Sequence, residues 1–216
     1  MHKTPLFTFP DADTDTQQIQ GFPRAAQVIA CWHAARGARP VPLRRDIAPA
    51  PLGAALAQCF IAALVSPRVA RLRIAGSGLH DLMGMDVRGM PLTAFFDTDA
   101  RRVVMQATEQ LCSGARVALP MVAERGLRRP PMEGILVMLP LSSDGNGIDM
   151  VLGALDTAGV TGTPPRRFAI AKPMPTAFGQ RTAPLAKMLQ DRMPVPAAKE
   201  RTGRRHGLRV IDGGRG

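Results

Sequence analysis

The amino-acid sequence predicts an α+β fold: a five-stranded antiparallel sheet with short helices on one face, an amphipathic N-terminal helix and a disordered basic C-terminal tail. Three observations predict this fold. Apolar residues alternate, or run continuously at strand length, within residues 59–75 and 117–155. Apolar residues recur at helical spacing in residues 22–36 and 98–112. From about residue 157, prolines and basic residues replace these patterns.

The chain begins with a segment that lacks periodicity, and the first helix follows it. Residues 1–20 are polar and partly acidic, so we expect a flexible leader. Residues 22–36 have the pattern of an amphipathic helix, and Gly37 is its stop signal. The prolines of residues 39–49 exclude a regular helix, whereas residues 51–57 suit one short helical turn.

A hairpin and a glycine-punctuated segment occupy the centre of the sequence. Residues 59–65 and 69–75 are two strand-length segments with a short connection, which favours a hairpin. The chain then turns at Gly76-Ser77-Gly78 and continues as a short helix that Gly84 breaks. A strand that leads into short, glycine-punctuated helical turns is typical of the wall of a ligand-sized pocket.

A longer helix follows this segment. Residues 91–96 suit one helical turn, and either Asp97 or Thr98 suits the N-cap of the next helix. The apolar positions of residues 98–112 recur at helical spacing, which predicts that one side of this helix packs on the sheet.

Three further strands complete the predicted sheet. Residues 117–121 alternate, residues 132–141 contain the continuous apolar run of an interior strand, and residues 148–155 form the last strand. Between the last two strands, Asp144-Gly-Asn-Gly147 predicts a type I′ hairpin turn, because Asn-Gly readily supplies two positive φ angles.

The charge is distributed unevenly along the chain. We divide the chain into a leader (1–20), a domain (21–157) and a tail rich in proline and arginine (158–216) that is largely disordered. Of the net charge of +11, residues 1–162 carry 16 Lys and Arg against 14 Asp and Glu, and residues 163–216 carry 12 against 3. A basic tail of this kind attracts nucleic acid, anionic lipid or acidic protein surfaces without specificity for any of them.

Cysteine usage and hydropathy indicate a cytoplasmic protein. Cys31, Cys59 and Cys112 lie far apart and form no CxxC pair, so we interpret them as reduced, buried thiols. The N-terminus lacks the apolar run of a signal peptide. The longest apolar stretches are far shorter than the roughly 20 residues that span a bilayer, so no membrane span is predicted.

The order of these elements and several local motifs resemble a family of small bacterial single-PAS-domain proteins. The likeness extends from about residue 25 to residue 156, and the tail lies outside it. A Trp-bearing helix leads into the family's proline-rich linker, and glycines at 84 and 89 follow the first two strands. The motifs that carry the resemblance are Pro42-Leu-Arg-Arg-Asp-Ile-Ala-Pro49, Arg73-Ile-Ala-Gly76, Met138-Leu-Pro-Leu141 and Leu152-Gly153.

The resemblance implies a non-catalytic module for signal input or protein interaction in bacterial signalling, often dimeric. A PAS-like fold places an apolar ligand pocket between the sheet and the short helices. We expect its wall to comprise Ile74, Leu79, His80, Leu82, Met83, Leu92, Phe95, Phe96, Val104, Leu119, Val137 and Leu139. The N-terminal helix either packs on its own sheet or forms a dimer or partner contact through Phe22, Val28, Ile29 and Trp32.

Cofactor and catalytic interpretations find little support in the sequence. Gly76-Ser-Gly78 lacks the third glycine and the parallel βαβ unit of a dinucleotide site. His80 is a candidate haem ligand, but the PAS haem sensors carry their ligand on the longer helix, which has no His here, and a hydrogen-bonded His is the simpler interpretation. Residues 77–96 contain no Cys for a flavin photosensor. The four histidines show no metal-ligand spacing and no pairing with a nucleophile, so we predict no metal site and no enzyme activity.

Two functions remain open at this point. The first is a sensory or regulatory module that binds a small apolar or amphipathic ligand, a partner protein, or both. The second is nucleic-acid or acidic-partner binding through the tail, with the domain as a dimerisation scaffold. Phe168 and Phe178 are the only aromatic residues of the tail, which weakens the second function because stacking on bases needs aromatic side chains.

Overall fold

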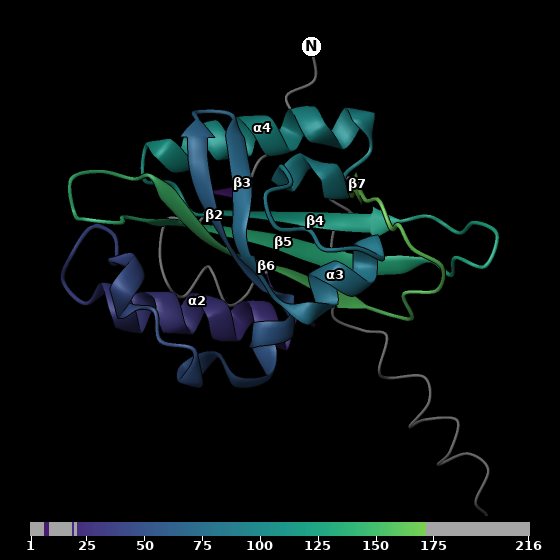
Figure 1. Cartoon of the computed structure of the whole chain (residues 1–216), viewed down its shortest axis with the longest axis horizontal. Helices are drawn as coiled ribbons and strands as arrows, with labels where there is room; N and C mark the ends of the chain where they lie inside the picture. The colour runs from purple at the N-terminus through teal and green to yellow at the C-terminus, as the bar shows by residue number, and fades with distance from the viewer. Residues whose placement is uncertain (1–6, 9–18, 20, 172–216) are drawn as a thin grey trace, which may run out of the picture. The chain divides into compact units, whose positions relative to one another are not determined.

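The computed structural model describes residues 7–8, 19 and 21–171, which are built around one antiparallel sheet. Five long strands form the sheet in the order β4-β5-β6-β2-β3 (Figure 1), and the predicted antiparallel arrangement is confirmed. The two-residue strands β1 (Phe7–Thr8) and β7 (Ala169–Ile170) both pair with β4. The long strands are β2 (Cys59–Ser66), β3 (Val69–Ala75), β4 (Val117–Ala123), β5 (Met132–Leu141) and β6 (Met150–Ala158).

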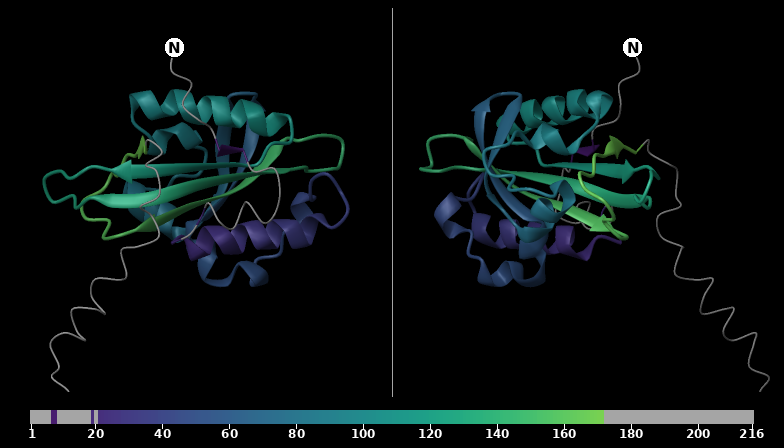
Figure 2. Two further views of the ribbon diagram at one scale, coloured as in Figure 1. Left: turned by 180° about the vertical axis from the view of Figure 1, so that it is seen from behind. Right: turned by 45° about the vertical axis from the view of Figure 1, so that its right-hand side comes forward.

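Helices cover both faces of the sheet, as the two views of Figure 2 show for α4 and α2. The three predicted short elements share one face, which we call the α4 face: α3 (Ser77–Met83), the 3₁₀ helix η3 (Leu92–Phe95) and α4 (Thr98–Cys112). The opposite face, the α2 face, carries α2 (Pro23–Arg36) and the 3₁₀ helices η1 (Arg44–Asp46) and η2 (Ala50–Gln58).

The sheet separates two hydrophobic cores, because side chains along a strand point alternately to its two faces. On β5, Leu136 and Met138 belong to the core under α4, and Val137 and Leu139 belong to the core under α2. All four side chains are fully buried. This double burial explains why residues 132–141 read as a continuous apolar run.

Local signals set the ends of the helices on the α4 face. The Asp97 carboxylate accepts a hydrogen bond of 2.8 Å from the Ala100 N–H, so Asp97 is the N-cap of α4. Gly84 ends α3 in the left-handed region, with φ of 70°.

Among the described residues, every helix is too short or too polar to cross a bilayer.

The connection between β5 and β6 differs from the predicted type I′ turn. The strands end at Leu141 and resume at Met150, so the connection is longer than two residues. Asn146 does not adopt a positive φ angle, because the Asp144 carboxylate accepts hydrogen bonds from its N–H and its side-chain amide instead. The Asp149 carboxylate closes the loop by accepting the Ser143 N–H at 2.8 Å.

The predicted tail begins later than residue 158. Residues 159–171 pack on the domain: the Phe168 side chain is fully buried in the core under α4, and β7 pairs with β4. Composition did not reveal this segment, because its two buried side chains, Arg166 and Phe168, stand among prolines and arginines. The prediction of disorder for residues 172–216 lies outside the described residues, as does most of the predicted leader, although Ile19 is buried under α2.

Candidate functional site

Most of the predicted pocket residues lie together under α3, η3 and α4. None of their side chains is more than 6% exposed, and all belong to one core cluster, in which they contact one another and the sheet. The side chains of this region therefore fill the space between helices and sheet with one another. The residues that the structure brings together as predicted are Leu79, Leu82, Met83, Leu92, Phe95, Phe96, Val104 and Leu119.

Three predicted pocket residues lie on the other face of the sheet. Val137 and Leu139 pack in the core under α2, because their neighbours Leu136 and Met138 take the α4 face. Ile74 also lies on the α2 face, with 49% of its side chain exposed. Their assignment to the α4-face pocket was wrong.

A β-bulge explains the position of Ile74. In the pairing of β2 with β3, Ile61 faces Ile74, but the next residue, Ala62, faces Leu72. Arg73 is therefore the extra residue, and Ile74 changes face relative to Leu72, which is buried under α4. Strict alternation along the sequence predicts the wrong face after such a bulge.

His80 is held by backbone groups through both ring nitrogens. Its Nδ1 accepts the Val87 N–H at 3.3 Å, and its Nε2 lies 3.3 Å from the Ala75 carbonyl oxygen. This arrangement fits a neutral ring with the proton on Nε2, which then donates to Ala75. His80 thus links α3 to the end of β3. Within the described ranges, no cluster of His, Cys, Asp or Glu could hold a metal ion.

The apolar side of α2 packs on its own sheet. The side chains of Phe22, Val28, Ile29 and Trp32 are no more than 8% exposed, and all four belong to the core under α2. The Trp32 indole N–H donates a hydrogen bond of 2.8 Å to the Pro140 carbonyl of β5. The partner contact expected of these four residues is therefore incompatible with the structure, because their side chains are already covered.

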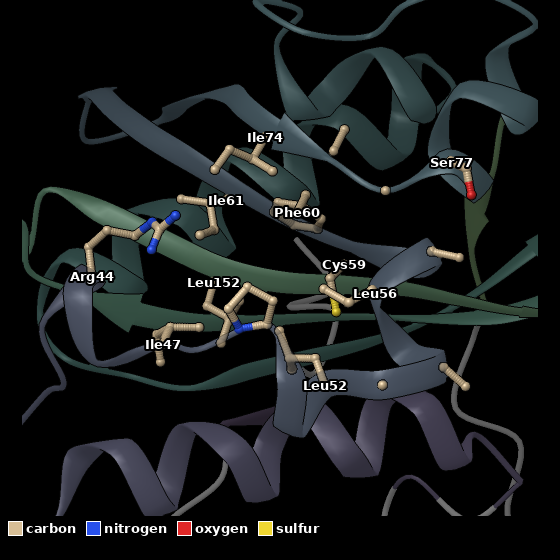
Figure 3. Close-up of a pocket in the computed structure, with 16 residues that line it drawn as sticks. Arg44, Ile47, Leu52, Leu56, Cys59, Phe60, Ile61, Ile74, Ser77 and Leu152 are labelled. Carbon is tan, nitrogen blue, oxygen red and sulfur yellow. The ribbon is translucent and has the colours of Figure 1, made fainter.

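A groove lies on the α2 face, where η2 stands beside the exposed side of β2 and β3 (Figure 3). We call it the β2–η2 groove, and its volume is about 550 Å³. Its floor is apolar and buried, and its rim carries two half-exposed side chains, Leu56 and Ile74. The lining residues are Arg44, Ile47, Pro49, Leu52, Gly53, Ala54, Leu56, Ala57, Cys59, Phe60, Ile61, Ile74, Ala75, Gly76, Ser77 and Leu152.

Glycine lets η2 approach the sheet closely enough to form one wall of this groove. A Cβ atom on Gly76 would lie 2.1 Å from the Leu56 carbonyl oxygen, and one on Gly78 would lie 2.9 Å from that of Ala57. Only glycine fits at Gly76, because a backbone oxygen cannot move aside as a flexible side chain would. The Gly-Ser-Gly motif is therefore a packing feature between β3, α3 and η2.

The proline-rich linker supplies one end of the groove. The Arg44 N–H donates to the Ser142 carbonyl at 2.7 Å, and the Ser142 N–H donates to the Pro42 carbonyl, so the linker extends the end of β5. Ile47 is buried against the sheet. In the sequence analysis this linker served only as a family motif, and its role as a wall of the groove was missed. The alternation of its prolines with apolar residues could have indicated that role.

The electrostatics of the groove are asymmetric. Arg44 is its single charged lining residue, and its guanidinium has no ion-pair or hydrogen-bond partner within the part of the chain that the structure describes. Burial, with smaller effects of Cys31 and Asp156, raises the pKa of the Cys59 thiol to about 12. Cys59 is therefore a neutral thiol in the floor of the groove and not a nucleophile.

Comparison with known proteins agrees with this geometry. A family model described as PAS domain matches residues 22–156, which is more than half of the chain. The matched range begins at the start of α2 and ends within β6, so it contains both helical layers, the strands β2 to β5 and most of β6. Searches against curated proteins and against solved structures found no match.

Proposed function

The chain belongs to the PAS domain family, and we propose that it is a non-catalytic sensory or regulatory module that binds a small ligand, a partner protein, or both. PAS domains are generally non-catalytic sensory modules, and we extend that character to this chain. The β2–η2 groove is the observation that carries the proposal. It combines an apolar floor, a half-exposed rim and one cation in a volume of about 550 Å³, within the usual size range of small-molecule sites.

The packing of the α4-face core favours the groove as the place of binding. A ligand between sheet and helices would have to displace side chains such as Phe95, Phe96 and Leu79, all of them fully buried. A ligand in the groove would contact side chains that are already accessible, such as Ile74 and Leu56. A ligand bound there would contact η2 and the end of β3, which meet at Gly76, and could shift one relative to the other.

PAS domains often mediate dimerisation or protein interaction, and we propose that this chain forms a homodimer. The contact would involve residues other than the four buried apolar side chains of α2. The structure offers Val65, near the end of β2, which is 50% exposed. The cytoplasmic location and the role in bacterial signalling stay predictions.

Native mass spectrometry of the full chain, purified from its own cells, tests the proposal. We expect either a mass excess that disappears on denaturation, from a bound small molecule, or a stable complex with a partner chain. An absorbance scan of the same sample would reveal a haem or a flavin, which we do not expect. A monomer of the mass of the bare chain, with no species captured from a native cell extract, contradicts the proposal.

Nucleic-acid binding through the basic tail is the second candidate. The excess of 12 basic over 3 acidic residues in residues 163–216 favours it. However, Phe168 is fully buried and is not available to stack on a base. A gel shift at low salt that compares the full chain with residues 1–171 tests this candidate; a shift by the full chain alone supports it, and no shift by either removes it.

A further inference from the structure

We propose that the β2–η2 groove binds a linear carboxylate amphiphile, with its headgroup at Arg44 and its apolar chain along Ile61 and Ile74. This inference rests on the proposed function, because it names the class of ligand that the groove accepts. In this proposal the space under α3 and α4 is a packed core, and the ligand binds on the opposite face of the sheet.

The headgroup end of the groove carries a positive charge, on Arg44, that no described residue pairs with. The backbone of Arg44 is fixed by its hydrogen bond to the Ser142 carbonyl. The acidic neighbour, Asp46, is occupied: its carboxylate accepts hydrogen bonds from Arg39 and from the Leu43 N–H. Arg44 is half-buried and is without a side-chain partner among the described residues, so a carboxylate would meet an available guanidinium.

The remainder of the groove is apolar over its length. Ile61 and Leu152, which are 7% and 1% exposed, form the floor, and Leu56 and Ile74 form the rim at 40% and 49%. Figure 3 shows Arg44 and Ser77 at opposite ends of the groove, with these apolar side chains between them. A chain of methylene groups laid on this surface would gain about 0.8 kcal/mol for each methylene that it fully buries.

The distribution of charge favours a small amphiphile over two other occupants. The basic residues 163–216 have a net charge of the same sign as Arg44, so the chain's own tail is not complementary to the groove. An acidic protein segment would be matched by several cations along the contact, whereas the described lining residues of the groove include one, Arg44, at its end. The groove has one cation at its end and apolar side chains along its length, which complements a ligand with one anionic headgroup and an apolar chain.

Calorimetric titration of the full chain with decanoate, below its micelle concentration, tests this inference. We expect saturable binding at one site per chain. Decanol, which lacks the charge, and acetate, which lacks the chain, should both bind much more weakly. Arg44→Gln should weaken decanoate binding by about tenfold or more, because it removes a charged hydrogen bond. Ile74→Ser should weaken it several-fold; this half-exposed position tolerates a polar side chain, so the variant should fold normally.

The chain offers a matched control for each variant. Arg45 lies next to Arg44 in η1, is exposed and does not line the groove, so Arg45→Gln should leave decanoate binding unchanged. Val65 is an exposed apolar residue of β2 outside the groove, so Val65→Ser should also leave it unchanged. Equal effects of Arg44→Gln and Arg45→Gln would show general charge attraction and would overturn the inference.

Methyl NMR spectra recorded during the titration locate the ligand. Shifts of the Ile61, Ile74 and Leu56 methyl groups support the inference. Shifts of the Val104 and Leu119 methyl groups in their place would put the ligand under α4 and overturn it, while leaving the proposed sensory function intact. Absence of saturable decanoate binding also overturns it. The proposed function fails only if native mass spectrometry finds neither a ligand nor a partner.

Discussion

The Asp156 carboxylate, near the end of β6, accepts the backbone N–H of Ala25, in the first turn of α2, at 3.0 Å. The same oxygen accepts the Arg24 N–H at 3.0 Å, and the Arg24 guanidinium forms an ion pair with the carboxylate. The residue at the N-cap position of α2, Phe22, offers no side-chain acceptor. Asp156 therefore caps α2 from another element and joins the helix to the sheet.

Asp156→Ala should lower the free energy of unfolding by about 1–3 kcal/mol, because two N–H groups at the start of α2 lose a buried, charged acceptor. Urea denaturation followed by the fluorescence of Trp32, which lies on α2, measures the loss. Asp99→Ala is the control, since the Asp99 side chain is 90% exposed and its ion pair with Arg102 is on the surface. Equal losses in the two variants would contradict the capping role.

Gly153→Ala should destabilise the sheet. A Cβ atom on Gly153 would lie 2.2 Å from the ring of Phe60, its partner across β6 and β2, and 2.6 Å from the Val137 carbonyl oxygen. Forcing atoms into such a contact typically costs about 1–3 kcal/mol. The same urea experiment checks it, and Gly147→Ala, where no atom lies within 4 Å of the added Cβ, should leave stability nearly unchanged.

Residues 159–171 should be necessary for full stability of the domain. Phe168→Ala should lower the free energy of unfolding by about 3–5 kcal/mol, because it leaves a cavity in the core under α4. A chain that ends at residue 171 should unfold at the temperature of the full chain, and a chain that ends at residue 157 should unfold at a lower one. Thermal unfolding by circular dichroism distinguishes them; identical curves would show that the segment is dispensable.

The carboxyl group of Asp86 should titrate at unusually low pH. Hydrogen bonds from the side chain and backbone of Arg88 lower the pKa of Asp86 from 3.8 to about 2. Because the pKa is lower in the folded state, the interaction stabilises the protein above about pH 3.8 and is lost as the pH falls through about 2. Both side chains are exposed, so the stabilisation is small. NMR titration measures the pKa, and Arg88→Gln should return it toward its ordinary value.

Local patterns were sufficient for the five long strands and for α2, α3 and α4. The hairpin of β2 and β3 and the stop of α3 at Gly84 depend on neighbouring residues, so the sequence predicted them correctly. For the N-cap of α4 the sequence offered Asp97 or Thr98, and the structure shows that it is Asp97. The turn around Asn146 was predicted wrongly, since side-chain hydrogen bonds within the loop replaced the backbone conformation that Asn-Gly favours.

The candidate site was predicted only in part, because the faces of a sheet depend on register. The bulge at Arg73 moved Ile74 to the α2 face, and burial of β5 on both sides divided its apolar residues between two cores. No local pattern indicated the β2–η2 groove, because its lining comes from the linker, β2, β3 and β6.

The sequence by itself determined the PAS architecture, through apolar periodicity, turn glycines and family motifs, all of which are properties of short segments. Only the tertiary structure decided which side chains remain accessible, that Asp156 caps α2 from 131 residues away and that Phe168 completes the core under α4. The physical reason is that burial and capping depend on which distant groups approach one another. That approach is set by packing of the whole domain and not by any one segment.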